Sequence, residues 1–124
     1  MVSGRQFRAL ALAFDGAIEG AHMDHPDFRA GGRIFASLHP DGHRAMVKLS
    51  PPQQQRWLAN PSLGSALAPA SGAWGRAGCT MLELAAVDAG SATDLLTEAW
   101  QNALAAPSPR ATRKKSEQKK SNKK

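Results

Sequence analysis

The sequence has no tyrosine, a single cysteine and no long apolar segment. One thiol, Cys79, cannot form an internal disulfide or a four-ligand zinc site, so we expect a protein of a reducing compartment, with Cys79 as a small core residue. No segment approaches the ~20 apolar residues that span a bilayer. The first fifteen residues also lack the layout of a signal peptide. These absences predict a soluble, cytoplasmic protein without a membrane partner.

Large apolar side chains are missing from residues 107–124, which therefore cannot offset the entropy of becoming ordered. We expect this segment to be a disordered, lysine-rich tail. Residues 1–106 remain, enough for one domain with a core of its own. The sequence thus predicts one folded domain and one tail, with a monomer as the default.

Positive charge is concentrated at the C-terminal end of the chain. Residues 110–124 carry eight basic side chains and one acidic side chain, a net charge of +7. The 109 residues before them carry eight basic and nine acidic side chains, a net charge of −1. The body is therefore nearly neutral, and any attraction for a polyanion is expected from the tail.

The first half of the chain indicates a helix followed by strands. Ser3 is suited to cap a helix that carries an apolar stripe and ends at Asp15-Gly16. Short apolar runs over residues 17–50 predict strands. Gly31-Gly32 predicts a tight hairpin, and the loop 39–43 predicts a second one. Alternation in the returning strand, 44–49, places its arginine and lysine on one face and three apolar residues in the core.

The second half is predicted to hold two helices and one more strand. Ser50 followed by two prolines is typical of a helix start, and this helix should end near Ala59. Residues 60–72 are predicted to form a loop, and residues 79–84 a strand. A last helix should begin near Ser91 and present a wide apolar face that includes Leu104. The order of elements predicts an α+β fold, an antiparallel sheet with helices packed on one side.

Catalytic and metal-binding patterns are weak in this sequence. No Gly-x-Ser-x-Gly motif is present, and the glycines at 31–32 and 75–78 are better explained by turns than by phosphate loops. On an extended strand His22 and His25 would point to opposite faces, so they could share a metal only if the chain bends sharply between them. Solvated or hydrogen-bonded histidines are therefore expected, including His39 and His43. We expect no enzyme activity, no cofactor and no metal.

Nucleic-acid binding is the better expectation, because clustered cations displace the counterions condensed on a phosphate backbone. Within the body, the candidate residues form three groups. One pair flanks the turn at Gly31-Gly32, and a second pair shares one face of the strand at residues 44–49. In the third group, Trp74 and Arg76 place an aromatic ring beside a cation. The competing interpretation is that Trp74 packs in the core or at its rim and that these cations are ordinary surface groups. The candidates are Arg29, Arg33, Arg44, Lys48, Trp74 and Arg76 in the body, with Arg110, Arg113, Lys114, Lys115, Lys119, Lys120, Lys123 and Lys124 in the tail.

Four segments resemble the MmcQ/YjbR family. The likeness runs from about Arg5 to Leu104 and includes a His-Pro-x-Phe-Arg element, a Gly-Gly hairpin, an Ile-Phe-Ala strand and a Trp-Gly-Arg element. The matching positions include His25, Pro26, Phe28, Trp74, Gly75 and Arg76.

The resemblance implies an α+β fold like that of the frataxin-type CyaY proteins and a role in DNA binding, with no catalytic residues to carry over. Arg33 stands where the family often has lysine, which keeps the charge. The tail lies outside the family pattern. We therefore expect a nonspecific or weakly specific DNA-binding protein, associated with the nucleoid, whose tail supplies phosphate contacts. The alternative is an adaptor for a protein or a small ligand, with the tail serving solubility.

Overall fold

The computed structural model describes residues 2–22 and 25–105. The predicted tail, residues 107–124, lies outside the described residues, and so do all eight of its basic candidates. The elements follow one another as α1 (Gly4–Leu12), β1 (Ile18–His22), β2 (His25–Ala30), β3 (Arg33–Leu38), β4 (Arg44–Lys48), α2 (Pro51–Leu58), β5 (Leu67–Pro69), α3 (Gly72–Arg76), β6 (Cys79–Glu83) and α4 (Ala89–Ala105), with short 3₁₀ turns at Gly64–Ala66 and Leu84–Ala86.

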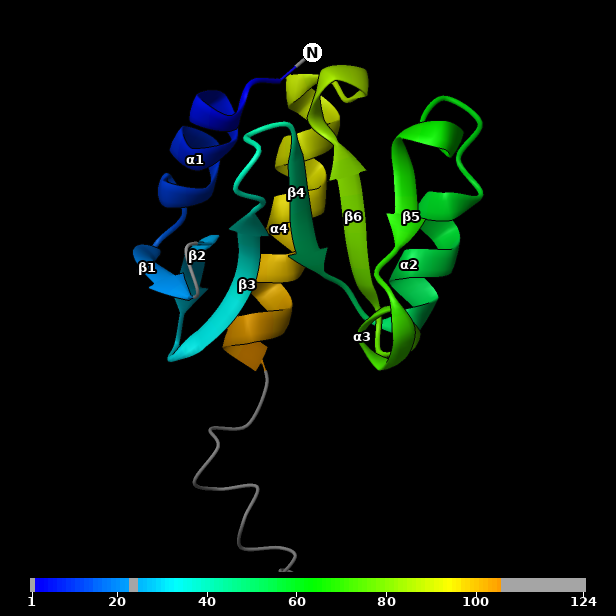
Figure 1. Cartoon of the computed structure of the whole chain (residues 1–124). Helices are drawn as coiled ribbons and strands as arrows, with labels where there is room; N and C mark the ends of the chain where they lie inside the picture. Colours follow the sequence, from blue (N-terminus) through cyan, green and yellow to red (C-terminus); the bar gives the residue numbers. More distant parts are fainter. Residues whose placement is uncertain (1, 23–24, 106–124) are drawn as a thin grey trace, which may run out of the picture.

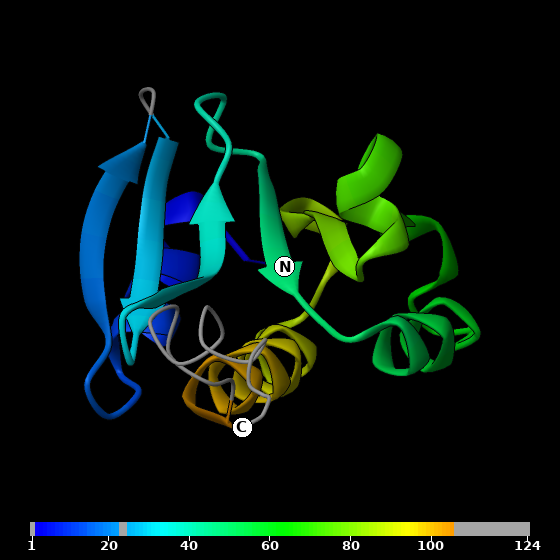
Figure 2. The same cartoon turned by 90° about the horizontal axis from the view of Figure 1, so that it is seen from below.

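One six-stranded sheet organises the structure, with the strand order β1-β2-β3-β4-β6-β5 and antiparallel pairing throughout. Helix α4 crosses behind the middle of the sheet, with α1 toward one end and α2 toward the other (Figure 1). Seen from below, the one-turn helix α3 stands on the opposite side of the sheet from α4 (Figure 2). The predicted α+β fold is confirmed, and α3 is an addition on the otherwise open face.

The core lies between the sheet and the three longer helices. Phe28 and Phe35 on the strands and Phe7 on α1 are fully buried, as are Leu95 and Leu96 on α4. The predicted alternation in β4 is confirmed, because Ala45 and Val47 are buried while Arg44, Met46 and Lys48 are not. One face of the sheet thus belongs to the core, and the other carries the polar and cationic side chains.

Local signals set the boundaries of several elements. Ser3 and Ser50 each form a capping box with the glutamine three residues later, which satisfies backbone N–H groups in the first turns of α1 and α2. Gly31 and Gly32 both have positive φ, 61° and 82°, as a two-residue hairpin between β2 and β3 requires. Helix α1 ends at Leu12 rather than at Asp15-Gly16, and α4 begins two residues before Ser91.

Two predictions for the second half of the chain were wrong. Residues 60–72 are not a plain loop, because they contain a 3₁₀ turn and the edge strand β5, which pairs with β6. Strand β5 has only three residues, too few to show an alternating pattern in the sequence. In the structure its first residue, Leu67, is buried. Leu104 is 49% exposed and lies at the rim of the core rather than in it.

A candidate polyanion-binding surface on the open face of the sheet

The open face of the sheet has a floor of small and sulfur-containing side chains. Ser37, Met46 and Met81 lie side by side on β3, β4 and β6, because the register pairs Ser37 with Met46 and Met46 with Met81. A hollow of ≈ 450 Å³ lies over this floor and is bounded by Arg44 and Trp74. Sequence reasoning placed Met46 on this face but gave Met46 and Met81 no role.

Trp74 is the most prominent side chain of this region. It projects from α3 with 66% of its surface exposed, so, of the two packing positions considered, the core is excluded. The ammonium group of Lys48 lies over the indole, 5.8 Å from the ring centroid, within the range of a cation–π contact. Lys48 and Trp74 therefore form one unit, although they come from β4 and α3.

A second hollow, of ≈ 490 Å³, also borders Trp74 and is lined by Arg33 and Lys48 among others. Trp74 and Cys79 line both hollows. The second hollow also reaches Ala105, the last residue of α4. The end of α4 and helix α3 lie at the same end of the sheet (Figure 1). Ala105, five positions before Arg110 in the sequence, therefore lies at this hollow.

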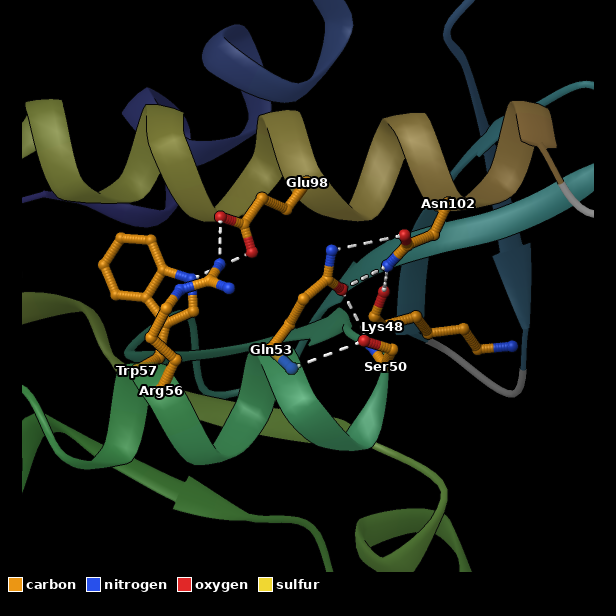
Figure 3. A network of polar contacts seen from close by, with 7 residues as sticks. All are labelled: Lys48, Ser50, Gln53, Arg56, Trp57, Glu98 and Asn102. Atoms are coloured by element: carbon orange, nitrogen blue, oxygen red, sulfur yellow. Dashed lines mark hydrogen bonds and ion pairs between the residues drawn. The ribbon is translucent and has the colours of Figure 1, made fainter.

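The end of β4 that carries Lys48 is fixed by a polar network between α2 and α4 (Figure 3). Asn102 donates a hydrogen bond to the Lys48 carbonyl, 3.2 Å long, and another to Gln53, 2.7 Å long. Further along the same helices, Glu98 accepts hydrogen bonds from Arg56 and Trp57. The Lys48 side chain extends away from this network in Figure 3. Its backbone is thus held in place, while its ammonium group lies over the Trp74 ring.

Helix α3 is held against the sheet by a buried glutamine and a glycine. Gln54 is 4% exposed, and its Nε2 lies 3.1 Å from the carbonyl oxygens of Gly75 and Cys79 and 3.2 Å from the Thr80 hydroxyl. A Cβ atom on Gly75 would lie 1.9 Å from the Ala70 carbonyl oxygen, so only glycine permits this approach. The indole of Trp74 therefore stands on a rigid base. The turn predicted for residues 75–78 is in part this helix.

Two of the predicted cations are already neutralised. Arg29 is bound to Asp27 at 2.7 Å, and this carboxylate is almost fully buried. The hydrogen bond that Arg29 donates to Asp27 is the main cause of a raised Arg29 pKa. Arg44 lies 3.0 Å from Asp41. The pKa of Asp41 is lowered to about 2, chiefly because its carboxylate accepts a hydrogen bond from the His43 N–H. Both arginines are on or near the open face, but a carboxylate holds each of them.

Lys48 and Arg76 differ from these arginines. Within residues 2–22 and 25–105, neither has an acidic side chain within ion-pairing distance. Arg76 is exposed on α3, two residues after Trp74. The structure therefore brings Lys48 and Trp74 together at one end of the open face, with Arg33 on the wall of the adjoining hollow, and Arg76 lies on the same short helix as Trp74. We call Lys48, Trp74 and Arg76 the Trp74 cluster.

The histidines and the cysteine do not form a site of their own. The chain does bend between His22 and His25, which pair across β1 and β2, and the His25 ring meets the His39 ring edge-on at 5.7 Å. In the described part of the chain, no group of three or more His, Cys, Asp or Glu side chains is placed to hold a metal ion. Burial raises the pKa of the Cys79 thiol, although nearby Lys48 opposes the shift.

The chain is similar to a known protein family and to a solved structure. The family model described as YjbR matches residues 12–102. The chain belongs to the YjbR family. Among solved structures, it is similar to the Deinococcus radiodurans protein DR2400, whose domain is described as DUF419. The TM-score is 0.72 at 18% sequence identity, over 92% of this chain and 87% of that one. This likeness supports the fold. No curated protein sequence matches the chain.

Membership in the YjbR family agrees with the resemblance drawn from the sequence. The matched range, residues 12–102, includes the elements that carry the Trp74 cluster, because β4, α3 and β6 all lie within it. The basic segment after residue 109 lies outside the matched range. Among the described residues, no helix is both long enough and apolar enough to cross a membrane.

Proposed function

We propose that this YjbR-family protein binds DNA, nonspecifically or with weak sequence preference, and that it acts by binding rather than by catalysis. The basic tail supplies most phosphate contacts, and the Trp74 cluster orients the nucleic acid on the folded body. The observation that carries the proposal is the position of Ala105 at the hollow lined by Trp74 and Lys48. A phosphate backbone held by the tail is thereby kept near the cluster.

The charge distribution supports a division of labour between tail and body. The tail has a net charge of +7 within fifteen residues, and neutralising several phosphates releases their counterions. The body has a net charge of −1, and Arg29 and Arg44 are held by carboxylates. Lys48 and Arg76 alone would give weak binding. Joined to the tail, they are presented to the bound DNA at a high effective concentration.

The direct test is equilibrium binding of the full chain to a fluorescent duplex at physiological salt, measured by anisotropy. We expect binding at micromolar protein and a loss of most of the affinity when residues 107–124 are removed. As a matched control, Lys48→Ala should weaken binding less than the truncation does. If the full chain leaves the anisotropy of the duplex unchanged at these concentrations, the proposed function is wrong.

One observation favours a second candidate, an adaptor for a protein or a small ligand. The hollow over Met46 and Met81 has a floor that resembles the adaptable, methionine-containing surfaces that bind apolar groups. On this account the tail serves solubility. Absence of DNA binding, combined with a protein partner that is lost in a Met46→Lys variant, would favour the adaptor over the DNA-binding protein.

A further inference from the structure

Phosphate binding alone does not explain why the indole of Trp74 is exposed. Phosphates need cations, and a duplex exposes its phosphates while its bases remain stacked on one another. An aromatic ring that is 66% exposed adds little to such an electrostatic contact. Unpaired bases, in contrast, stack on aromatic side chains, and this contact tolerates any base because every base has a π face.

The surroundings of Trp74 suit an unpaired base and its phosphate. Trp74 lines two hollows and is 66% exposed, so a flat group has room beside the ring. Lys48 holds a positive charge 5.8 Å from the ring centroid, and Arg76 is exposed on the same short helix. A nucleotide stacked on the ring would therefore carry its phosphate into a cationic environment. An apolar peptide would gain nothing from these two cations.

The backbone that carries the ring is also held before any ligand arrives. The Gln54 side chain donates to the Gly75 carbonyl, and Gly75 approaches the Ala70 carbonyl so closely that a side chain there would clash. A fixed aromatic surface loses less conformational freedom on binding than a mobile one, which raises the affinity that a stacking contact can give. By comparison, Trp57 and Trp100 both pack against the core and donate hydrogen bonds from their indole N–H groups.

We propose that Trp74 is a stacking platform for an unpaired nucleobase, so that the protein distinguishes single-stranded from duplex nucleic acid. This inference rests on the proposed function, because the tail must first hold the phosphate backbone. The stacking role adds a class of ligand to the proposed function: a single strand, or an unpaired segment within a duplex. Lys48 and Arg76 contact the phosphates next to the stacked base.

The test compares three probes on the full chain: an oligothymidine, an abasic oligomer with the same number of phosphates, and a duplex with that number. One aromatic–base stack predicts oligothymidine binding roughly five- to 150-fold tighter than abasic binding. Trp74→Ala should remove this difference. Trp74→Phe should retain part of it. Ile18→Ala is the matched control, because Ile18 is similarly exposed, at 62%, on the far edge strand.

A second readout does not depend on a variant. Oligothymidine should quench the tryptophan fluorescence of the full chain, and the abasic oligomer should not, because only a stacked base reaches the exposed indole. Equal binding of oligothymidine and abasic oligomer, or a preference that survives in Trp74→Ala, would overturn the stacking role while leaving DNA binding by the tail intact. Failure to bind any of the three probes would overturn the proposed function itself.

Discussion

Gln54 is the residue whose removal tests most sharply how the site is built. Its amide is buried between α2, α3 and β6, and the two Nε2 hydrogens are shared among three acceptors, on Gly75, Cys79 and Thr80. The two carbonyl oxygens each keep another donor, since Gly78 N–H reaches Gly75 and Ala70 N–H reaches Cys79. Gln54→Ala therefore loses the hydrogen bonds of two N–H groups without leaving a carbonyl unpaired.

The expected magnitude follows from that count. At ~0.5–1.5 kcal/mol for each of two net hydrogen bonds, Gln54→Ala should lower the free energy of unfolding by about 1–3 kcal/mol. For a domain of this size the melting temperature should fall by ~5–25 °C. Urea unfolding of the variant and of the wild-type chain measures the difference. A change below ~0.5 kcal/mol, the level of an ordinary surface substitution, would refute the role given to Gln54.

An isosteric variant separates hydrogen bonding from packing. Gln54→Glu keeps the volume but faces three acceptor oxygens with a carboxylate, so burial and these oxygens should raise its pKa in the folded state. A group with a raised folded pKa stabilises the protein below its unfolded pKa, ~4.3, and loses that contribution as the pH rises. The variant should therefore be least stable at neutral pH and recover on acidification. A pH-independent loss would point to packing alone.

Three further predictions concern charge and reactivity. Lys48→Ala should reduce the salt slope of DNA binding by about 1, and Arg44→Ala should reduce it less, because Asp41 already neutralises that arginine; equal reductions in anisotropy titrations would contradict this. The ionised Asp41 carboxylate should stabilise its loop fully above the ordinary pKa of the group and lose that effect as the pH falls through about 2. A carboxyl titration by NMR with a midpoint near the ordinary value would exclude it. The Cys79 thiol, buried and with a raised pKa, should react with an aromatic disulfide reagent far more slowly than free cysteine until denaturant is added; rapid reaction of the native protein would show that the strand opens.

The sequence was most informative where a local rule has a single structural solution. Ser3 and Ser50 were expected to start helices, and both form capping boxes. Gly31-Gly32 was expected to form a hairpin, and both glycines have the positive φ that this turn needs. The alternation in β4 placed Arg44 and Lys48 on the open face correctly. These features depend on neighbours within a few residues, which the sequence displays directly.

The candidate site depended on contacts that no local pattern contains. Lys48 and Trp74 are 26 positions apart in the sequence and meet only because α3 stands on the open face. Arg29 is paired with Asp27, and Arg44 with Asp41, so these two predicted cations offer less positive charge to a ligand than the sequence suggested. Sequence reasoning counted positive charges, and the structure separates those held by carboxylates from Lys48 and Arg76. Strand β5 was missed because it is short and lies at an edge.

The central claim is that the tail supplies the phosphate contacts and that the body adds only a few. The most direct measurement is the affinity for duplex DNA across a salt series, with the full chain and with a chain that ends at residue 106. If about five phosphates are neutralised, the full chain should show a slope of log affinity against log salt of roughly −4 to −5. With Lys48 and Arg76 alone, the shortened chain should give a slope no steeper than about −2. Equal slopes for the two chains would contradict the account.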